Sequence, residues 1–142
     1  MAKKRLLAED FERYGRAALF GGASAALLNI IVLLLARGAG YSPMARSGGM
    51  LVPESISVLQ VTLSCLIPAI GASVLLRILI KSTRKPETIF YKIAMIFLVL
   101  SMSGPAMVPV NRLATRFILG VMHLVAAGAI IGSLQKVRLL RK

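Results

Sequence analysis

The residues of this 142-residue chain that could do chemistry are few, and most of them lie inside long apolar segments. There is one histidine, His123, and one cysteine, Cys65. A single cysteine excludes an intramolecular disulfide and a Cys-x-x-Cys redox pair, and the two residues together cannot supply the four ligands of a structural zinc site. We expect no metal, no cofactor and no enzymatic activity, because the sequence has no visible nucleophile–base or carboxylate pair.

The carboxylates lie outside the apolar segments, at Glu9, Asp10, Glu12, Glu54 and Glu87. Small proton-coupled multidrug exporters of similar size depend on a carboxylate within the membrane. Ionisable groups inside a membrane segment are the usual mark of such proton coupling. The sequence therefore argues against this kind of exporter.

Uncharged polar side chains recur at one level of the apolar segments. If the outer ends of the segments are placed at Ala36, Ser57, Val108 and Phe117, a rise of about 1.5 Å per residue puts a polar group about 5–10 Å below each end. These groups belong to Asn29, Gln60, Ser64, Ser101, Ser103 and His123. We expect them to point inward as a polar layer, because lipid would leave their donors and acceptors unpaired.

Prolines and arginines flank this layer. Pro68 and Pro105 each lack a backbone N–H, which frees the carbonyl four residues earlier, and the run Ser103-Gly-Pro predicts a kink. Arg112 and Arg116 stand above the layer, where guanidinium groups attract anions or lipid phosphates. The candidate ligand-binding residues are Asn29, Gln60, Ser64, Ser101, Arg112, Arg116 and His123. Hydrogen bonds that only tie helices together explain the same polar residues.

The sharpest site hypothesis is a pocket that opens outward between Arg116, His123 and Gln60. Arg116 and His123 are seven residues apart, about two turns along one helix face. Such a pocket suits an anionic or polar ligand or a lipid headgroup. The alternative is that Arg116 reaches lipid phosphates while His123 bonds to a neighbouring helix.

The elements that must position these residues are four stretches without a formally charged side chain: Ala17–Ala36, Ile56–Leu76, Ile93–Val110 and Phe117–Gln135. A bilayer core about 30 Å thick needs roughly 20 apolar residues of helix, so each stretch can span it. We predict an all-α fold, a four-helix transmembrane bundle with up-down-up-down topology. It forms a single domain over residues 1–142, with spans at about 17–36, 56–80, 89–110 and 116–135.

The basic residues indicate the orientation of the bundle. The net charge is +13, and fourteen of the 18 Lys and Arg residues lie before the first span, around the connection between spans two and three, or after the last span. The positive-inside rule predicts that both termini and this connection are cytoplasmic, in the bacterial inner (plasma) membrane. Anionic lipid headgroups attract the same residues, so we expect membrane lipids as partners and no nucleic acid.

The N-terminal segment does not match a secretory signal peptide, because 16 residues precede an apolar run that is too long. Leu6, Leu7, Phe11 and Tyr14 fall near helical spacing, so we expect residues 1–16 to form a cytoplasmic amphipathic lead-in along the membrane surface. The connection at 37–55 is rich in Gly and Pro, which favours turns over regular structure.

Small residues predict where helices approach closely. Gly21 and Gly22 lie in the first span, and Gly128 and Gly132 form a Gly-x-x-x-Gly pattern in the last. This pattern permits close backbone contact. It suits packing within one bundle, or alternatively an interface with another membrane protein or a second copy of this chain.

Several segments resemble a known family: Leu51-Val-Pro, Leu66-Ile-Pro-Ala, Leu100–Pro105 and, most closely, Arg112–Leu134. The chain is similar over roughly residues 17–134 to a family of small four-span bacterial membrane proteins, common in actinobacteria and classed as a domain of unknown function. The resemblance implies the four-span fold and draws attention to His123. It implies no activity.

Two classes of function follow from the sequence. The first is a non-enzymatic membrane protein that binds a small molecule or lipid or serves as an accessory subunit. The alternative is a small transporter or channel that works through the polar layer. A monomer with a closed, hydrogen-bonded core favours the first class, whereas a dimer with a continuous water path favours the second.

Overall fold

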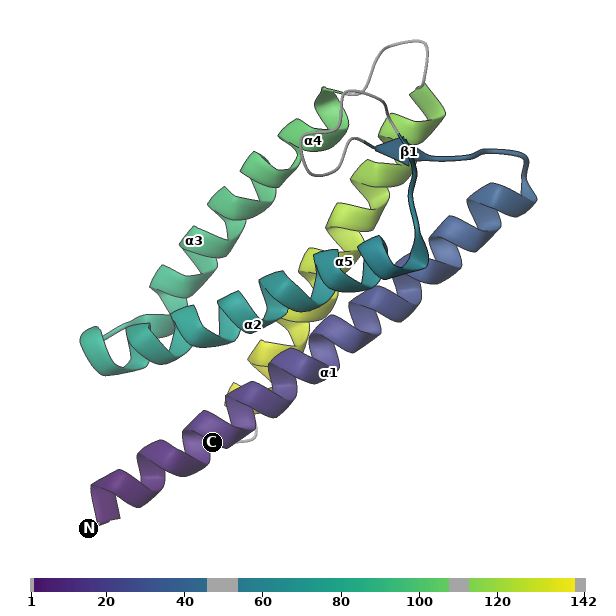
Figure 1. Cartoon of the computed structure of the whole chain (residues 1–142). Helices are drawn as coiled ribbons and strands as arrows, with labels where there is room; N and C mark the ends of the chain where they lie inside the picture. The colour runs from purple at the N-terminus through teal and green to yellow at the C-terminus, as the bar shows by residue number, and fades with distance from the viewer. Residues whose placement is uncertain (1, 46–53, 108–112, 140–142) are drawn as a thin grey trace.

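The computed structural model describes residues 2–45, 54–107 and 113–139, with side chains at 12–44, 54–107 and 113–136. Its helices are α1 (Ala2–Gly38), α2 (Val58–Ser82), α3 (Pro86–Ser101), α4 (Ser103–Ala106) and α5 (Leu113–Leu139). A short antiparallel pair, β1 (Met44–Ala45) and β2 (Glu54–Ser55), lies between α1 and α2. The long helices form a bundle with both ends of the chain at the same end, which we call the terminal end (Figure 1).

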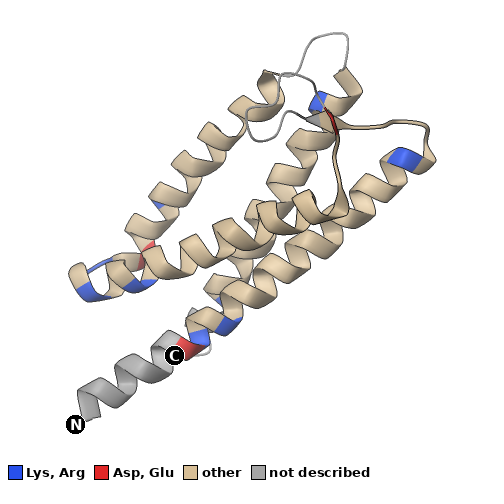
Figure 2. Ribbon diagram, in the orientation of Figure 1, with Lys and Arg blue, Asp and Glu red and all other residues tan. Residues whose placement is uncertain are grey.

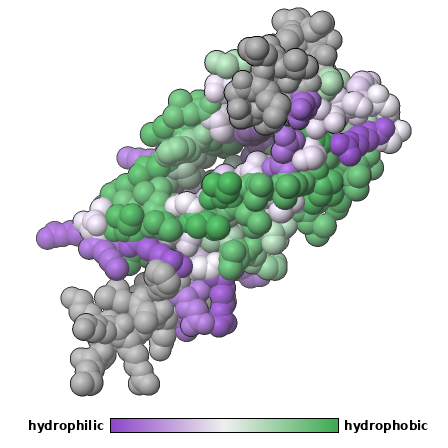
Figure 3. All heavy atoms as spheres, viewed as in Figure 1, coloured by the Kyte–Doolittle hydropathy of each residue, from purple (hydrophilic) through white to green (hydrophobic). Residues whose placement is uncertain are grey.

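Four helices are long and apolar enough to cross a membrane: Glu12–Gly38, Val58–Ser82, Pro86–Ala106 and Leu113–Lys136. The third of these combines α3 and α4. Figure 3 shows apolar residues over the middle of the visible face and hydrophilic residues toward its ends. The prediction of an all-α fold with four membrane-spanning helices is therefore confirmed.

The first helix is continuous over 37 residues, from Ala2 to Gly38. The lead-in at residues 1–16 was expected to lie along the membrane surface, but its helical part is the first turns of α1 itself (Figure 1). A continuous helix keeps each backbone N–H paired with the carbonyl four residues earlier, which a sharp turn at the membrane surface would interrupt. The segment therefore continues the first helix, and its place along the membrane surface stays a prediction.

The end of the bundle opposite the termini, which we call the far end, is tied together by local hydrogen bonds. Arg37 donates from Nη2 to the carbonyl of Ile56 at 2.7 Å, and the Ile56 N–H donates to the carbonyl of Pro43 at 3.1 Å. In the strand pair, Met44 lies opposite Ser55. The expectation of turns alone in residues 37–55 is thus wrong at these strands, because backbone pairing satisfies groups that a loop would leave to water.

The third span breaks near its far end, as the Ser103-Gly-Pro run predicts. Helix α3 ends at Ser101, Met102 connects it to α4, and Pro105 is buried within α4. Pro105 has no N–H to donate to the Ser101 carbonyl, so the regular pattern cannot continue across this point. Pro68, in contrast, lies inside α2 without dividing it.

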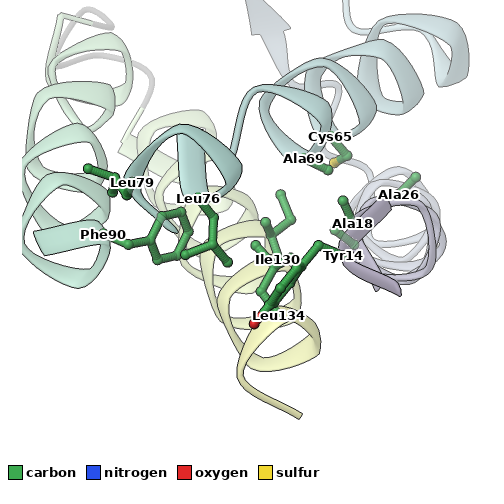
Figure 4. Packing of buried hydrophobic residues seen from close by; sticks show 11 residues of the cluster. Tyr14, Ala18, Ala26, Cys65, Ala69, Leu76, Leu79, Phe90, Ile130 and Leu134 are labelled. Atoms are coloured by element: carbon green, nitrogen blue, oxygen red, sulfur yellow. The ribbon is translucent and has the colours of Figure 1, made fainter. Parts of the chain in front are cut away.

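Helix α1 is the centre of the packing, between α2 and α5. A Cβ atom added at Gly21 would lie 2.1 Å from Ser133 Oγ of α5, and one added at Gly22 would lie 2.9 Å from Ala69 Cβ of α2. We compared the 18 consecutive residues of highest mean hydropathy in each span. Of these residues, 39% are buried in the first span but only 11% in the third. Figure 4 shows Phe90 of α3 beside Leu76 and Leu79 of α2, where the third span joins the core.

Candidate functional site

Asn29 is the member of the expected polar layer that the structure buries, with 3% of its surface exposed. Its Nδ2 donates to the Met122 carbonyl of α5 at 3.0 Å and to Cys65 Sγ of α2 at 3.4 Å. Its Oδ1 has no hydrogen-bond partner among the described residues. Asn29 thus connects three helices by hydrogen bonds. This agrees with the alternative in which the polar residues tie helices together.

Three other residues of the expected layer, Ser64, Ser101 and Gln60, form hydrogen bonds within or at the start of their own helices. Ser64 and Ser101 are exposed, and each hydroxyl donates to the carbonyl three residues earlier, at 2.9 and 2.7 Å. Gln60 and Ser57 form a capping box at the start of α2: Gln60 Oε1 accepts from the Ser57 N–H at 2.8 Å, and Ser57 Oγ accepts from the Gln60 N–H at 3.1 Å. The hydroxyls of Ser64 and Ser101 are thus satisfied locally, and Gln60 caps the start of α2.

His123 and Arg116, the proposed outward pocket residues, are both half-buried on α5. His123 Nδ1 lies 2.8 Å from the Leu119 carbonyl of the same helix. Arg112 lies outside the described residues. The pocket expected between His123, Arg116 and Gln60 stays a prediction.

The described residues instead form a pocket at the terminal end, and sequence reasoning missed it. This terminal pocket has a cavity of about 400 Å³ and is lined by Tyr14, Leu76, Glu87, Thr88, Phe90, Tyr91, Lys92, Leu134 and Gln135. Residues from α1, α2, α3 and α5 contribute, so the pocket depends on the whole bundle. Its volume lies within the range of ordinary small-molecule sites.

Helix α3 supplies more than half of the pocket lining. It begins with Pro86 at its first position and Glu87 in its first turn, a sequence that starts a helix favourably because proline fixes φ and a carboxylate complements the helix dipole. Glu87, Thr88, Tyr91 and Lys92 are spaced i, i+1, i+4 and i+5, so they share one face. This spacing is the sequence signal that could have indicated the pocket.

The opposite wall is held more tightly. Tyr14 is 5% exposed, and Ser73 of α2 donates to its carbonyl at 3.4 Å. Leu134 of α5 is 2% exposed and packs in the same cluster as Tyr14 (Figure 4). Next to Tyr14, a Cβ added at Gly15 would lie 2.6 Å from Arg77 Nη2. Gly15 therefore lets the Arg77 guanidinium lie directly against α1, next to the pocket residue Tyr14.

The charges of the described residues are concentrated at the terminal end (Figure 2). The basic residues there are Arg13, Arg16, Arg77, Lys81, Arg84, Lys85, Lys92 and Lys136, against the acidic residues Glu12 and Glu87. Glu12 forms an ion pair with Arg16 on the surface of α1. A pocket with apolar and aromatic walls, one carboxylate and one ammonium thus opens in a basic region.

The glycine pairs have different roles. Gly21 and Gly22 make close contacts within the chain, as the packing interpretation predicted. Gly128 and Gly132 are exposed, and a Cβ added at either would meet no atom within 4 Å. The prediction that the Gly-x-x-x-Gly pattern packs within the bundle is therefore wrong, because these two glycines face away from the other described helices.

The fold and this lining define a class, a four-helix protein of membrane-spanning character with an amphipathic pocket at one end. The chain belongs to the family of unknown function DUF6069, whose model matches residues 9–138. The resemblance to a domain-of-unknown-function family is thereby confirmed. No curated protein and no solved structure matches the chain.

Proposed function

We propose that this chain is a non-enzymatic integral membrane protein that binds an amphiphilic small molecule or lipid in the terminal pocket. The observation that carries the proposal is the lining of the pocket. Tyr14, Leu76, Phe90 and Leu134 offer apolar surface, while Glu87 and Lys92 offer opposite charges. An amphiphile matches both parts, because its apolar part is removed from water and its polar part stays paired.

The position of the pocket supports the same proposal. It lies at the ends of the spans, where Lys81 is in the last turn of α2, Arg84 follows that helix and Lys136 ends the fourth span. Side chains at such ends meet lipid headgroups, and their basic groups are attracted to phosphate. An accessory role in a larger membrane complex is compatible with this binding.

The chain has no tryptophan, so a single introduced Trp reports on one place. We would compare Tyr91→Trp, inside the pocket, with Phe20→Trp, an aromatic position on α1 that is 72% exposed and does not line the pocket. Each protein in detergent micelles is titrated with a phospholipid whose acyl chains carry bromine, which quenches Trp fluorescence. Binding predicts saturable quenching at lower lipid content for Tyr91→Trp. Adding Thr88→Phe, which fills the pocket lining, should shift that curve toward the control, whereas identical curves for the two reporters would refute the proposal.

We also propose that the terminal end faces the cytoplasm and that the membrane is the bacterial inner (plasma) membrane, because short connections rich in Lys and Arg resist translocation. Lys85→Cys at the terminal end and Glu54→Cys at the far end give a matched pair of exposed positions. An impermeant thiol reagent applied to intact cells should modify Glu54→Cys alone. Cys65 is 1% exposed and serves as an unreactive internal background. Modification of Lys85→Cys in intact cells would show that the terminal end faces outward and would contradict the proposed orientation.

Self-association through α5 is a further proposal, favoured by the open space in front of Gly128 and Gly132. Two copies could bring these backbones close together, as Gly-x-x-x-Gly patterns do in membranes. Native mass spectrometry should find dimers for the natural chain and monomers for the Gly128→Val/Gly132→Val variant. A variant that keeps the same subunit count would refute this interface.

A further inference from the structure

We infer that the terminal pocket selects a zwitterionic aminophospholipid headgroup, with a phosphate and a primary ammonium. This inference rests on the proposed function and names the chemical class of its ligand. It follows from the order in which the side chains of α3 occur along the pocket, and not from the apolar lining alone.

The first step is the pairing of charges in one lining. Glu87 and Lys92 are the carboxylate and the ammonium among the nine lining residues. A carboxylate accepts hydrogen bonds from a primary ammonium, and a lysine donates to a phosphate. A purely anionic headgroup would use Lys92 but meet Glu87 as a like charge, and a purely cationic one would do the reverse. A zwitterionic headgroup can satisfy both.

The second step is the direction of α3. Glu87 lies in the first turn, at the terminal end, and Lys92 lies five residues further along, about 7.5 Å of helical rise. Exposed apolar residues continue beyond it at Met95, Ile96 and Phe97. The sequence of carboxylate, lysine and apolar surface is the order of ammonium, phosphate and acyl chains in a phosphoethanolamine lipid, counted from water into the membrane. The long stem of Lys92 lets its ammonium reach back to the phosphate level.

The aromatic lining supports the ammonium end of this ligand. Tyr14, Phe90 and Tyr91 all line the pocket with Glu87. Aromatic faces attract ammonium groups, and the attraction increases when water is excluded. A quaternary ammonium shares this attraction but has no N–H to donate to Glu87. The pocket should therefore prefer phosphoethanolamine to phosphocholine.

The poorly packed third span explains how a lipid reaches the pocket. Only 11% of its 18 most apolar consecutive residues are buried, so much of α3 is open to lipid along its length. The acyl chains can lie against this open surface while the headgroup enters the cavity between α3 and the other helices. A lipid could not enter between α1 and its neighbours α2 and α5, because these helices are in close contact.

The test uses the Tyr91→Trp protein in phosphatidylcholine vesicles that contain increasing fractions of brominated phosphatidylethanolamine or brominated phosphatidylglycerol. We expect half-maximal quenching at about a three- to tenfold lower fraction of the ethanolamine lipid, the size expected for one charged hydrogen bond in a partly exposed site. Phe20→Trp should show no difference between the two lipids.

Two charge variants then separate the possible ligands by the sign of their effects. Glu87→Gln and Lys92→Gln should each weaken binding of the ethanolamine lipid, while Lys81→Gln, an exposed lysine at the same end that does not line the pocket, should leave it unchanged. If Glu87→Gln instead improves quenching by the glycerol lipid and that lipid binds best, the site takes an anionic headgroup and the inference is overturned while the proposed function stands. If neither lipid quenches Tyr91→Trp better than Phe20→Trp, the proposed function itself fails.

Discussion

Helix α1 and the third span differ sharply in how they are held. Helix α1 touches α2 and α5 through glycines that leave no space for a side chain, whereas the third span joins the bundle mainly at its terminal end, around the buried Phe90. In a membrane, close packing of small residues is a main source of helix association, because lipid tails are as apolar as leucine. The comparison indicates a fixed scaffold of α1, α2 and α5 and a more weakly attached third span that forms one wall of the terminal pocket.

The strongest test of this comparison is a pair of identical glycine substitutions. Gly22→Val would place a Cβ 2.9 Å from Ala69 Cβ, while Gly128→Val would meet no atom within 4 Å. Overpacking costs about 1–3 kcal/mol, so Gly22→Val should lower the thermal midpoint clearly and Gly128→Val should not. Both changes alter helix propensity alike, and circular dichroism in detergent measures both. Equal losses would mean that α1 is no more tightly packed than the outer face of α5.

The next largest effect concerns the attachment of the third span. Phe90→Ala removes a side chain that is 5% exposed and packs with Leu76 and Leu79. We expect a loss of stability below the 3–5 kcal/mol typical of soluble cores, because lipid replaces some of the lost contacts. The clearer result should be a broader distribution of distances between the third span and α5.

Pulsed electron resonance can measure this distribution in a Cys65→Ala background. Spin labels at the exposed positions Phe97 of α3 and Leu124 of α5 report on the third span, and labels at Leu27 of α1 and Leu124 report on the scaffold. Phe90→Ala should broaden the first distribution and leave the second unchanged. If both broaden together, the two regions are one mechanical unit.

The four spans could be predicted from the sequence, because the thickness of the bilayer requires long unbroken apolar segments. Sequence reasoning located Asn29 as an inward-facing polar residue, since a buried amide in lipid must find partners. It did not find the terminal pocket, because polarity along a segment does not show which face of a helix is buried. Ser64 and Ser101 satisfy their own hydroxyls locally and so need no partner helix. The pocket lining comes from four helices and depends on their relative positions, which spacing within one segment does not define.

A smaller effect is expected at the hydrogen-bonded junction of the scaffold. Asn29→Ala removes the donor to Met122 and Cys65, and interhelical hydrogen bonds in membranes contribute about 0.6–2 kcal/mol. We expect a modest loss of stability and unchanged quenching of the Tyr91→Trp reporter, because Asn29 does not line the terminal pocket. Loss of lipid binding without loss of stability would instead make Asn29 a ligand residue.

The smallest effects should come from two serines of the predicted polar layer. Ser64→Ala and Ser101→Ala each remove a hydroxyl that bonds only to its own helix at an exposed position, so each should change stability by less than about 0.5 kcal/mol. Thermal unfolding of both variants and of the double variant measures this directly, with Asn29→Ala as the sensitive reference. The transporter alternative makes the opposite prediction, because a conducting polar layer would need these hydroxyls. An ion or solute flux in reconstituted vesicles that falls in the double variant would support the polar layer as the functional site in place of the terminal pocket.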